Sequence, residues 1–222
     1  MGERLISAIR EHPSRWALVL LFALCAAYSF DLPLARSFYI PERGFTWDTD
    51  GVLEFVRVAA PDIVIGSFVV CVLLWGAARF KPLPHPSGRQ IGFLLTTILI
   101  GPGLIVEGIL KPTWGRARPK DIVEFGGQAI YTPPWEITDQ CASNCAFTSG
   151  HAAIAFWIAA YAFLLPPKWR AAGIFAGVVL GLMVGGVRIA QGAHFLSDVA
   201  AAGVVVLAVN AVFARLMLRV PS

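Results

Sequence analysis

A long apolar run, Gln90-Ile-Gly-Phe-Leu-Leu-Thr-Thr-Ile-Leu-Ile-Gly-Pro-Gly-Leu-Ile-Val-Glu-Gly-Ile-Leu110, is followed at once by Lys111-Pro-Thr-Trp-Gly-Arg-Ala-Arg-Pro119. The first part contains one charged residue, Glu107, and is long enough to cross the ~30 Å hydrocarbon core of a bilayer as a helix. The second part is rich in cations. This abrupt change predicts a transmembrane helix that ends at a membrane surface.

Five further apolar stretches have the same character, and prolines and polar clusters separate them. They cover residues 14–30, 62–80, 150–165, 169–187 and 196–218. With 57% hydrophobic and 14% charged residues, the composition lies outside the range of soluble domains. We therefore expect an all-α, polytopic membrane protein with about six transmembrane helices, in which residues 1–222 form a single domain. The glycine and alanine content of the spans predicts close helix packing.

The distribution of charge predicts the orientation. If the N-terminus is cytoplasmic, the cytoplasmic segments hold ten basic and two acidic residues, whereas the other side holds eight basic and twelve acidic ones. Both termini are then cytoplasmic. The alternative for the first stretch is a cleaved signal peptide, which would leave all later loops on the same side. The net charge of +4 comes from scattered residues that form no basic stripe, so nucleic acid is not an expected partner.

The four cysteines fall into two pairs. Cys25 and Cys71 lie within apolar spans and are expected to be small buried hydrophobes. Cys141 and Cys145 lie four apart in an outside loop, where an oxidising compartment would permit a disulfide. Two free thiols are an alternative. A metal site is a weaker one, because two cysteines without nearby histidines supply half of a tetrahedral shell.

Three polar clusters interrupt the apolar pattern, and the predicted orientation places all of them at the outer membrane boundary. They are residues 111–119, 147–151 and 188–198. A phosphoryl group in transfer requires cations and N–H donors around its oxygens. The clusters supply three cations and a small-residue helix start that together predict a phosphate site: Lys111, Arg118, Arg188, Ser149 and Gly150.

The same clusters contain the groups for covalent catalysis. His194 and Asp198 lie four apart, so on one helix face the carboxylate would accept a proton from one imidazole nitrogen and leave the other as a nucleophile. His151 suits the general acid that protonates the leaving oxygen. Two histidines with opposite protonation requirements predict a bell-shaped pH profile.

Each of these features also has a structural interpretation. Basic residues after a span often reach toward lipid headgroups, and a single histidine is more often structural than catalytic. The structural interpretation does not predict three such clusters at one membrane face. Glu107, a carboxylate inside a span, is interpreted as the structural partner of Lys111 four residues later.

These residues resemble the motifs of the type 2 phosphatidic acid phosphatase (PAP2) superfamily, which shares its site architecture with vanadium haloperoxidases. Lys111 and Arg118-Pro119 fit the first motif, Ser149-Gly150-His151 most of the second, and Arg188, His194 and Asp198 the third. The resemblance covers roughly residues 90–218. The departures are Thr148, where the family usually has proline, and Val187, where it usually has serine.

The resemblance implies a metal-independent enzyme without cofactors in the bacterial inner membrane, with its site facing the periplasm. It implies phosphate binding by Lys111, Arg118, Ser149, Gly150 and Arg188. His151 would be the acid, His194 the nucleophile and Asp198 its orienting partner. The expected partner is a phosphorylated membrane lipid, and the oligomeric state is left open.

The amino-acid sequence of the first motif, from Trp114 to Pro119, and the loop of Cys141 and Cys145 resemble those of lipid A phosphatases and favour lipid A as the substrate. Undecaprenyl pyrophosphate, phosphatidylglycerophosphate and phosphatidic acid remain alternatives, as does phosphotransfer to a lipid acceptor. A non-enzymatic alternative is a transporter or lipid-binding scaffold that uses the cations only to hold an anion, for which His151, His194 and Asp198 would not be needed.

Overall fold

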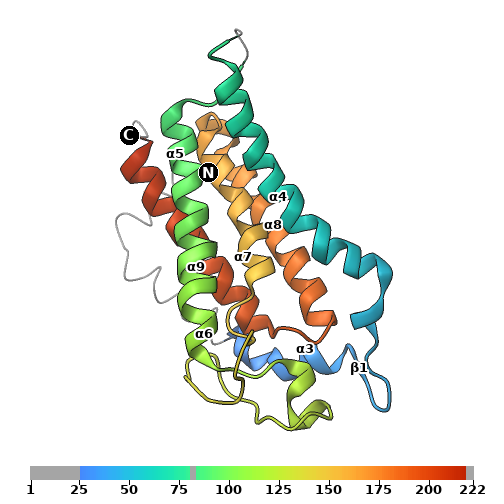
Figure 1. Ribbon diagram of the computed structural model, residues 1–222. Coiled ribbons are helices and arrows are strands. Elements are labelled where there is room, and N and C mark those ends of the chain that lie inside the picture. The colour runs from blue at the N-terminus through green and yellow to red at the C-terminus, as the bar shows by residue number, and fades with distance from the viewer. Residues whose placement is uncertain (1–25, 81–83, 219–222) are drawn as a thin grey trace.

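The computed structural model describes residues 26–80 and 84–218 and consists of long helices packed side by side (Figure 1). Four of these helical segments are long and apolar enough to cross a membrane. They are α4 (Gly51–Ala77), the continuous segment that begins with α5 (Gly88–Ile98), α8 (Pro167–Ala190) and α9 (Leu196–Met217). The prediction of an all-α, polytopic membrane protein is confirmed.

Two of the six expected spans differ from this group. The stretch 14–30 lies almost entirely outside the described residues. The stretch 150–165 forms a shorter apolar segment, in which α7 (Gly150–Trp157) continues as the 3-10 helix η5 (Ile158–Leu164). Within the described part of the chain, the structure therefore supports four long spans and this shorter central segment.

The segment from residue 31 to 61, expected to be a polar loop, contains regular structure. It holds the short helix α3 (Asp31–Arg36), a hairpin of β1 (Tyr39–Ile40) and β2 (Gly44–Phe45), and the 3-10 turn η1 (Thr46–Thr49). The helix α4 then begins eleven residues before the expected Asp62. Asp50 caps its start by accepting hydrogen bonds from the backbone N–H groups of Val52 and Leu53. Pro61 was interpreted as a boundary, but it lies inside the helix, as membrane helices tolerate.

The span expected at residues 90–110 runs without interruption into the first motif. After α5 it widens into the π-helical η2 (Leu99–Leu110) and ends in α6 (Lys111–Trp114). Pro102 lies in the widened part and has no N–H to donate to a regular helix. The 3-10 turns η3 (Pro119–Asp121) and η4 (Val123–Phe125) follow in the long connection to α7.

Close packing around α7 depends on a row of glycines along one face of α8. A Cβ atom added at Gly181 would lie 2.2 Å from the ring of Phe156, and one at Gly185 would lie 2.3 Å from Val199. Gly177 is similarly close to Ala159. The spacing of four residues places these glycines on one face, so helix backbones approach closely there. This confirms the packing expected from composition.

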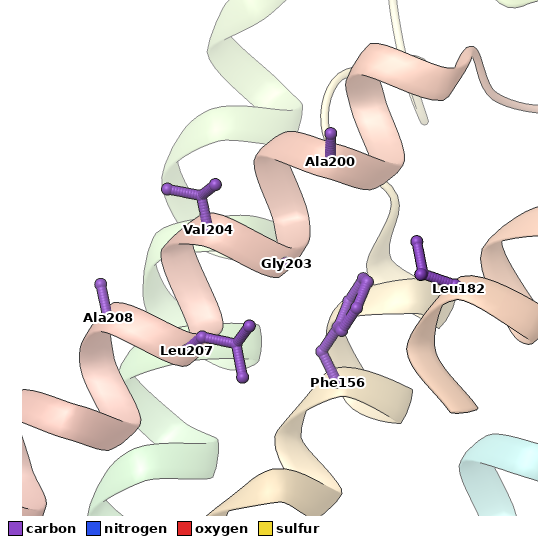
Figure 2. Close-up of a pocket in the computed structure, with 7 residues that line it drawn as sticks. All are labelled: Phe156, Leu182, Ala200, Gly203, Val204, Leu207 and Ala208. Carbon is purple, nitrogen blue, oxygen red and sulfur yellow. The ribbon is translucent and has the colours of Figure 1, made fainter. Parts of the chain in front are cut away.

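The bundle also has an apolar hollow of about 280 Å³ among α7, α8 and α9 (Figure 2). Its lining is Phe156, Leu182, Ala200, Gly203, Val204, Leu207 and Ala208. No side chain in this lining can bind a phosphate group. The polar residues lie instead at the end of the bundle where α3, α6 and the start of α9 meet (Figure 1).

Candidate active site

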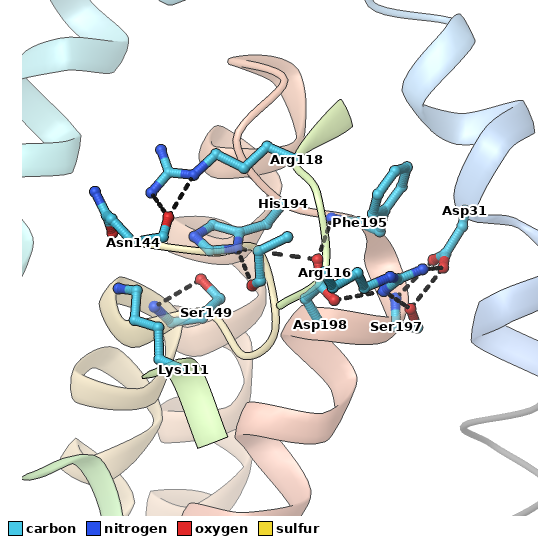
Figure 3. Close-up of polar contacts among 12 residues, drawn as sticks. Asp31, Lys111, Arg116, Arg118, Asn144, Ser149, His194, Phe195, Ser197 and Asp198 are labelled. Carbon is cyan, nitrogen blue, oxygen red and sulfur yellow. Dashed lines mark hydrogen bonds and ion pairs between the residues drawn. The ribbon is translucent and has the colours of Figure 1, made fainter. Parts of the chain in front are cut away.

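The structure brings residues of the three polar clusters together at this end of the bundle. Figure 3 shows Lys111 from α6, Arg118 from the following loop, Ser149 at the start of α7, and His194 and Asp198 around the start of α9. Residues as far apart in the chain as Lys111 and Asp198 therefore form one polar region. This arrangement is the convergence that the sequence led us to expect.

His194 is at the centre of the region and is 1% exposed. Its Nδ1 atom lies 2.7 Å from the carbonyl oxygen of Ala146, so Nδ1 carries the proton and donates it to that oxygen. Burial lowers the pKa of His194 well below its usual value, and the positive charges of Arg188 and Arg118 lower it further. The imidazole is therefore neutral, and Nε2 keeps a lone pair available for reaction.

Asp198 does not make the contact with His194 that the spacing predicted. Its Oδ2 atom lies 3.9 Å from Nδ1 of His194, beyond hydrogen-bonding distance, and accepts the backbone N–H of Phe195 at 2.7 Å instead. The reason is that α9 begins at Leu196, so His194 precedes the helix and does not share a helical face with Asp198. The Ala146 carbonyl takes the expected position of the carboxylate.

Lys111 and Glu107 form the ion pair that their spacing predicted. The Nζ atom of Lys111 lies 3.0 and 3.3 Å from the two carboxylate oxygens of Glu107. The pair packs directly on Gly150, because a Cβ atom there would lie only 1.7 Å from Glu107 Oε1 and 3.5 Å from Lys111 Nζ. Glycine at position 150 is therefore required for this close approach.

The start of α7 lies beside this pair. The hydroxyl of Ser149 caps the helix by accepting the backbone N–H of Ala152 at 3.4 Å, and the N–H of Ser149 donates to the carbonyl of Asp198. His151 follows in the first turn, where it lies in the electrostatic field of Arg188, Arg57 and other cations of the region. A helix N-terminus surrounded by cations favours an anionic ligand.

The connection before α7 holds two further groups. Arg118 donates from Nε and Nη2 to the carbonyl of Asn144, at 2.9 and 2.6 Å. Asn144 lies within the loop that Cys141 and Cys145 close as a disulfide. The next residue, Ala146, provides the carbonyl that contacts His194. The disulfide loop therefore borders both an expected phosphate ligand and the expected nucleophile.

Arg188 lies in the last turn of α8 and is 7% exposed. Its Nη1 atom donates to Oε1 of Gln191 at 2.5 Å, which orients the guanidinium within the turn that leads to His194. The described residues contain no group of three or more His, Cys, Asp or Glu side chains that could hold a metal ion.

Sequence reasoning missed several residues of the region. Arg116 lies among the basic residues after the span, for which contact with lipid headgroups was the structural interpretation, but it is fully buried and bonds to Asp198. Asp31 lay in the expected polar loop, but it is also fully buried and pairs with Arg116. Arg57 of α4 lay in the same expected loop. The one available signal was the position of Arg116 inside the first motif, since nothing in the sequence links residue 31 to residue 116.

The fold and these motifs define a family. Residues 90–220 match the PAP2 superfamily, and the chain belongs to it, which confirms the family expected from the motifs. Over 207 residues the chain is 33% identical to the lipid A 4'-phosphatase of Francisella tularensis subsp. novicida (strain U112), covering 92% of this chain and 91% of that protein.

Two shorter alignments are also informative. The chain is 36% identical over 111 residues to a lipid A 4'-phosphatase of Rhizobium leguminosarum, covering 50% of this chain and 48% of the relative. It is 34% identical over 147 residues to a lipid A 1-phosphatase of Rhizobium etli, covering 61% and 59%. No solved structure matches the chain.

Proposed function

We propose that this protein is a membrane lipid phosphatase that removes a phosphate group from lipid A through a phosphohistidine at His194. One observation carries the proposal: a buried, neutral imidazole has its Nδ1 proton committed to the Ala146 carbonyl, which leaves Nε2 as the nucleophile. Lys111, Arg118 and Arg188 are cations of the same region and suit a phosphate group.

The residues support the following reaction. Nε2 of His194 attacks phosphorus while the bond between phosphorus and the lipid oxygen breaks, and His151, which the negative charge of the bound phosphate group keeps protonated, donates its proton to that oxygen. A water molecule, deprotonated by His151, then cleaves the phosphorus–nitrogen bond and releases inorganic phosphate. Lys111, Arg118 and Arg188 hold the equatorial oxygens throughout, because negative charge is spread over them in the transition state.

The relatives support the substrate. The relative aligned over nearly its whole length is named for the 4'-phosphate of lipid A, whereas the one named for the 1-phosphate aligns over 59% of its length. We therefore propose the 4'-phosphate as the group removed. The site would lie at the periplasmic face of the bacterial inner membrane, in line with the charge distribution.

The test of the activity is phosphate release by purified protein in detergent and excess chelator. The substrates are lipid A with both phosphates, undecaprenyl pyrophosphate, phosphatidylglycerophosphate and phosphatidic acid, and mass spectrometry identifies the position that is lost. We expect release from the 4' position of lipid A and none from His194→Ala. The matched control is His85→Ala, because His85 lies in the connection of α4 to α5 at the opposite end of the bundle.

Other outcomes would change the proposal. Preference for another lipid would retain the reaction and replace the substrate. Release that requires an added acceptor lipid would indicate phosphotransfer. Binding of lipid A without turnover under any condition would support a scaffold or transporter instead of an enzyme.

The orientation needs a separate test. Val123 and Trp169 are both well exposed and lie on opposite sides of the proposed membrane. In a background that carries Cys25→Ala and Cys71→Ala, a membrane-impermeant maleimide should label Val123→Cys in intact spheroplasts and leave Trp169→Cys unlabelled. The reverse pattern would refute the periplasmic location of the site.

A further inference from the structure

Behind Asp198 lies a buried network of side chains that belong to none of the residues expected at the site. At its centre is Arg116, which is fully buried. Its Nη1 atom lies 2.5 Å from Oδ1 of Asp198, and its Nη2 atom lies 2.9 Å from Oδ2 of Asp31 (Figure 3). Its Nε atom donates to the carbonyl of Thr132 at 2.9 Å. The planar guanidinium is therefore held on three sides.

Asp31 connects this network to the start of α9. Its Oδ1 atom accepts the backbone N–H of Ser197 at 2.8 Å, and its Oδ2 atom accepts the hydroxyl of Ser197 at 2.5 Å. The hydroxyl of Tyr131 donates to the same Oδ2 atom at 3.2 Å. Burial and the neighbouring carboxylate of Asp31 raise the pKa of Tyr131, so its hydroxyl remains a donor. A short helix far away in the sequence thus fixes the turn that carries His194.

Arg116 supports both groups beside the imidazole of His194. Through its side chain it holds Asp198, whose other oxygen binds the backbone N–H of Phe195, the residue after His194. Through its backbone carbonyl it accepts the N–H of Ala146 at 2.9 Å, and the Ala146 carbonyl contacts Nδ1 of His194. Displacing Arg116 would therefore disturb the imidazole from two directions.

The charges of the network matter as much as its geometry. Two carboxylates and one guanidinium, all fully buried, carry a net charge of −1. Without Asp31, Arg116 would cancel the charge of Asp198. When Nε2 accepts a phosphoryl group while Nδ1 keeps its proton, the imidazole becomes positively charged. The carboxylate of Asp198, 3.9 Å away, stabilises that charge.

We propose that Asp31 and Arg116 are positioning residues of the reaction, which keep Asp198 oriented and leave a net negative charge beside the phosphorylated form of His194. This inference rests on the proposed function. It assigns roles to two residues that act through Asp198 and Ala146 and do not touch the substrate.

Asp31→Asn tests the charge, because the amide has the shape of the carboxylate. We expect kcat to fall roughly 10- to 100-fold, by analogy with the hydrogen-bond partners of metal ligands, with KM within about twofold because no phosphate ligand changes. The groups that face His194 are the cations Lys111, Arg118 and Arg188 and the carboxylate Asp198. Without the negative charge of Asp31, these cations should lower the pKa of His194 further. The acid limb of the pH profile should therefore move to lower pH.

Arg116→Lys tests the geometry, because lysine keeps the charge and loses the planar arrangement of donors. It should lower kcat without moving the acid limb in the direction seen for Asp31→Asn. The matched control is Thr97→Val in α5, which removes the buried acceptor of the Trp157 indole N–H and lies outside the site. This control should lower the thermal stability and leave kcat and the pH profile unchanged.

The outcomes separate the two proposals. The positioning role would be overturned if the wild type is active and Asp31→Asn folds and keeps both the wild-type kcat and the wild-type acid limb. If Asp31→Asn does not fold, wild-type kcat in Arg116→Lys would overturn it. A wild type that releases no phosphate from any lipid would refute the proposed function itself.

Discussion

Gly150→Ala should nearly abolish activity through a single added methyl group. The new Cβ atom would lie 1.7 Å from Glu107 Oε1, whereas ordinary contact between such atoms needs about 3.5 Å. The carboxylate must therefore retreat by about 1.8 Å. Its ion pair with Lys111 Nζ, now 3.0 Å long, would then break or carry Lys111 with it.

The expected size of the effect follows from this displacement. A shift of about 1 Å in a positioned group can reduce a rate ~100-fold, so we expect kcat/KM to fall by about that factor. The contacting atoms are the end of the flexible Glu107 side chain, which is about half exposed and can turn away, so the free energy of unfolding should fall by less than the ~1–3 kcal/mol of an overpacked core. The assay is phosphate release from lipid A across substrate concentrations, with thermal unfolding measured in the same detergent.

The matched control is Gly186→Ala in α8, where nothing lies within 4 Å of the added methyl group. It should keep wild-type activity and gain up to ~1 kcal/mol in stability from better helix propensity. If Gly150→Ala kept kcat/KM within twofold of the wild type, the argument that the Glu107–Lys111 pair positions a phosphate ligand against Gly150 would fail.

Three further predictions concern His194, the disulfide and helix packing. Because the pKa of His194 is lowered and its neutral form is the nucleophile, kcat/KM should persist below pH ~6.5 and fall only as the pH drops through the lowered pKa; a half-loss at or above pH 6.5 would contradict this. Reduction of Cys141–Cys145 should lower phosphate release several-fold because the loop supplies a carbonyl to Arg118 and directly precedes Ala146, whose carbonyl contacts His194, whereas a variant with both cysteines replaced by alanine should not respond to reductant. Gly181→Val should lower Tm in detergent because its Cβ atom would lie 2.2 Å from the ring of Phe156, and an unchanged Tm would refute the packing argument.

Much of the fold was predictable because the bilayer restricts what an apolar run of about 20 residues can do. The runs that became α8 and α9 were placed within a few residues of their observed limits. The start of α4 was predicted incorrectly. The span was expected to begin only after Pro61, but the helix begins at Gly51 behind the cap Asp50, because a membrane helix can pass through a proline.

Part of the candidate site was likewise predictable from the sequence, and part was not. Composition and the spacing of local motifs determined the membrane class, the family and the candidate phosphate site around Lys111 and His194, because these depend on residues close together in the chain. Two features could not be predicted without the folded structure: a backbone carbonyl contacts His194, and Arg116, paired with Asp31, holds Asp198. These contacts join segments about 50 to 170 residues apart, and the burial of their charges arises only when α3, the first motif and α9 pack together.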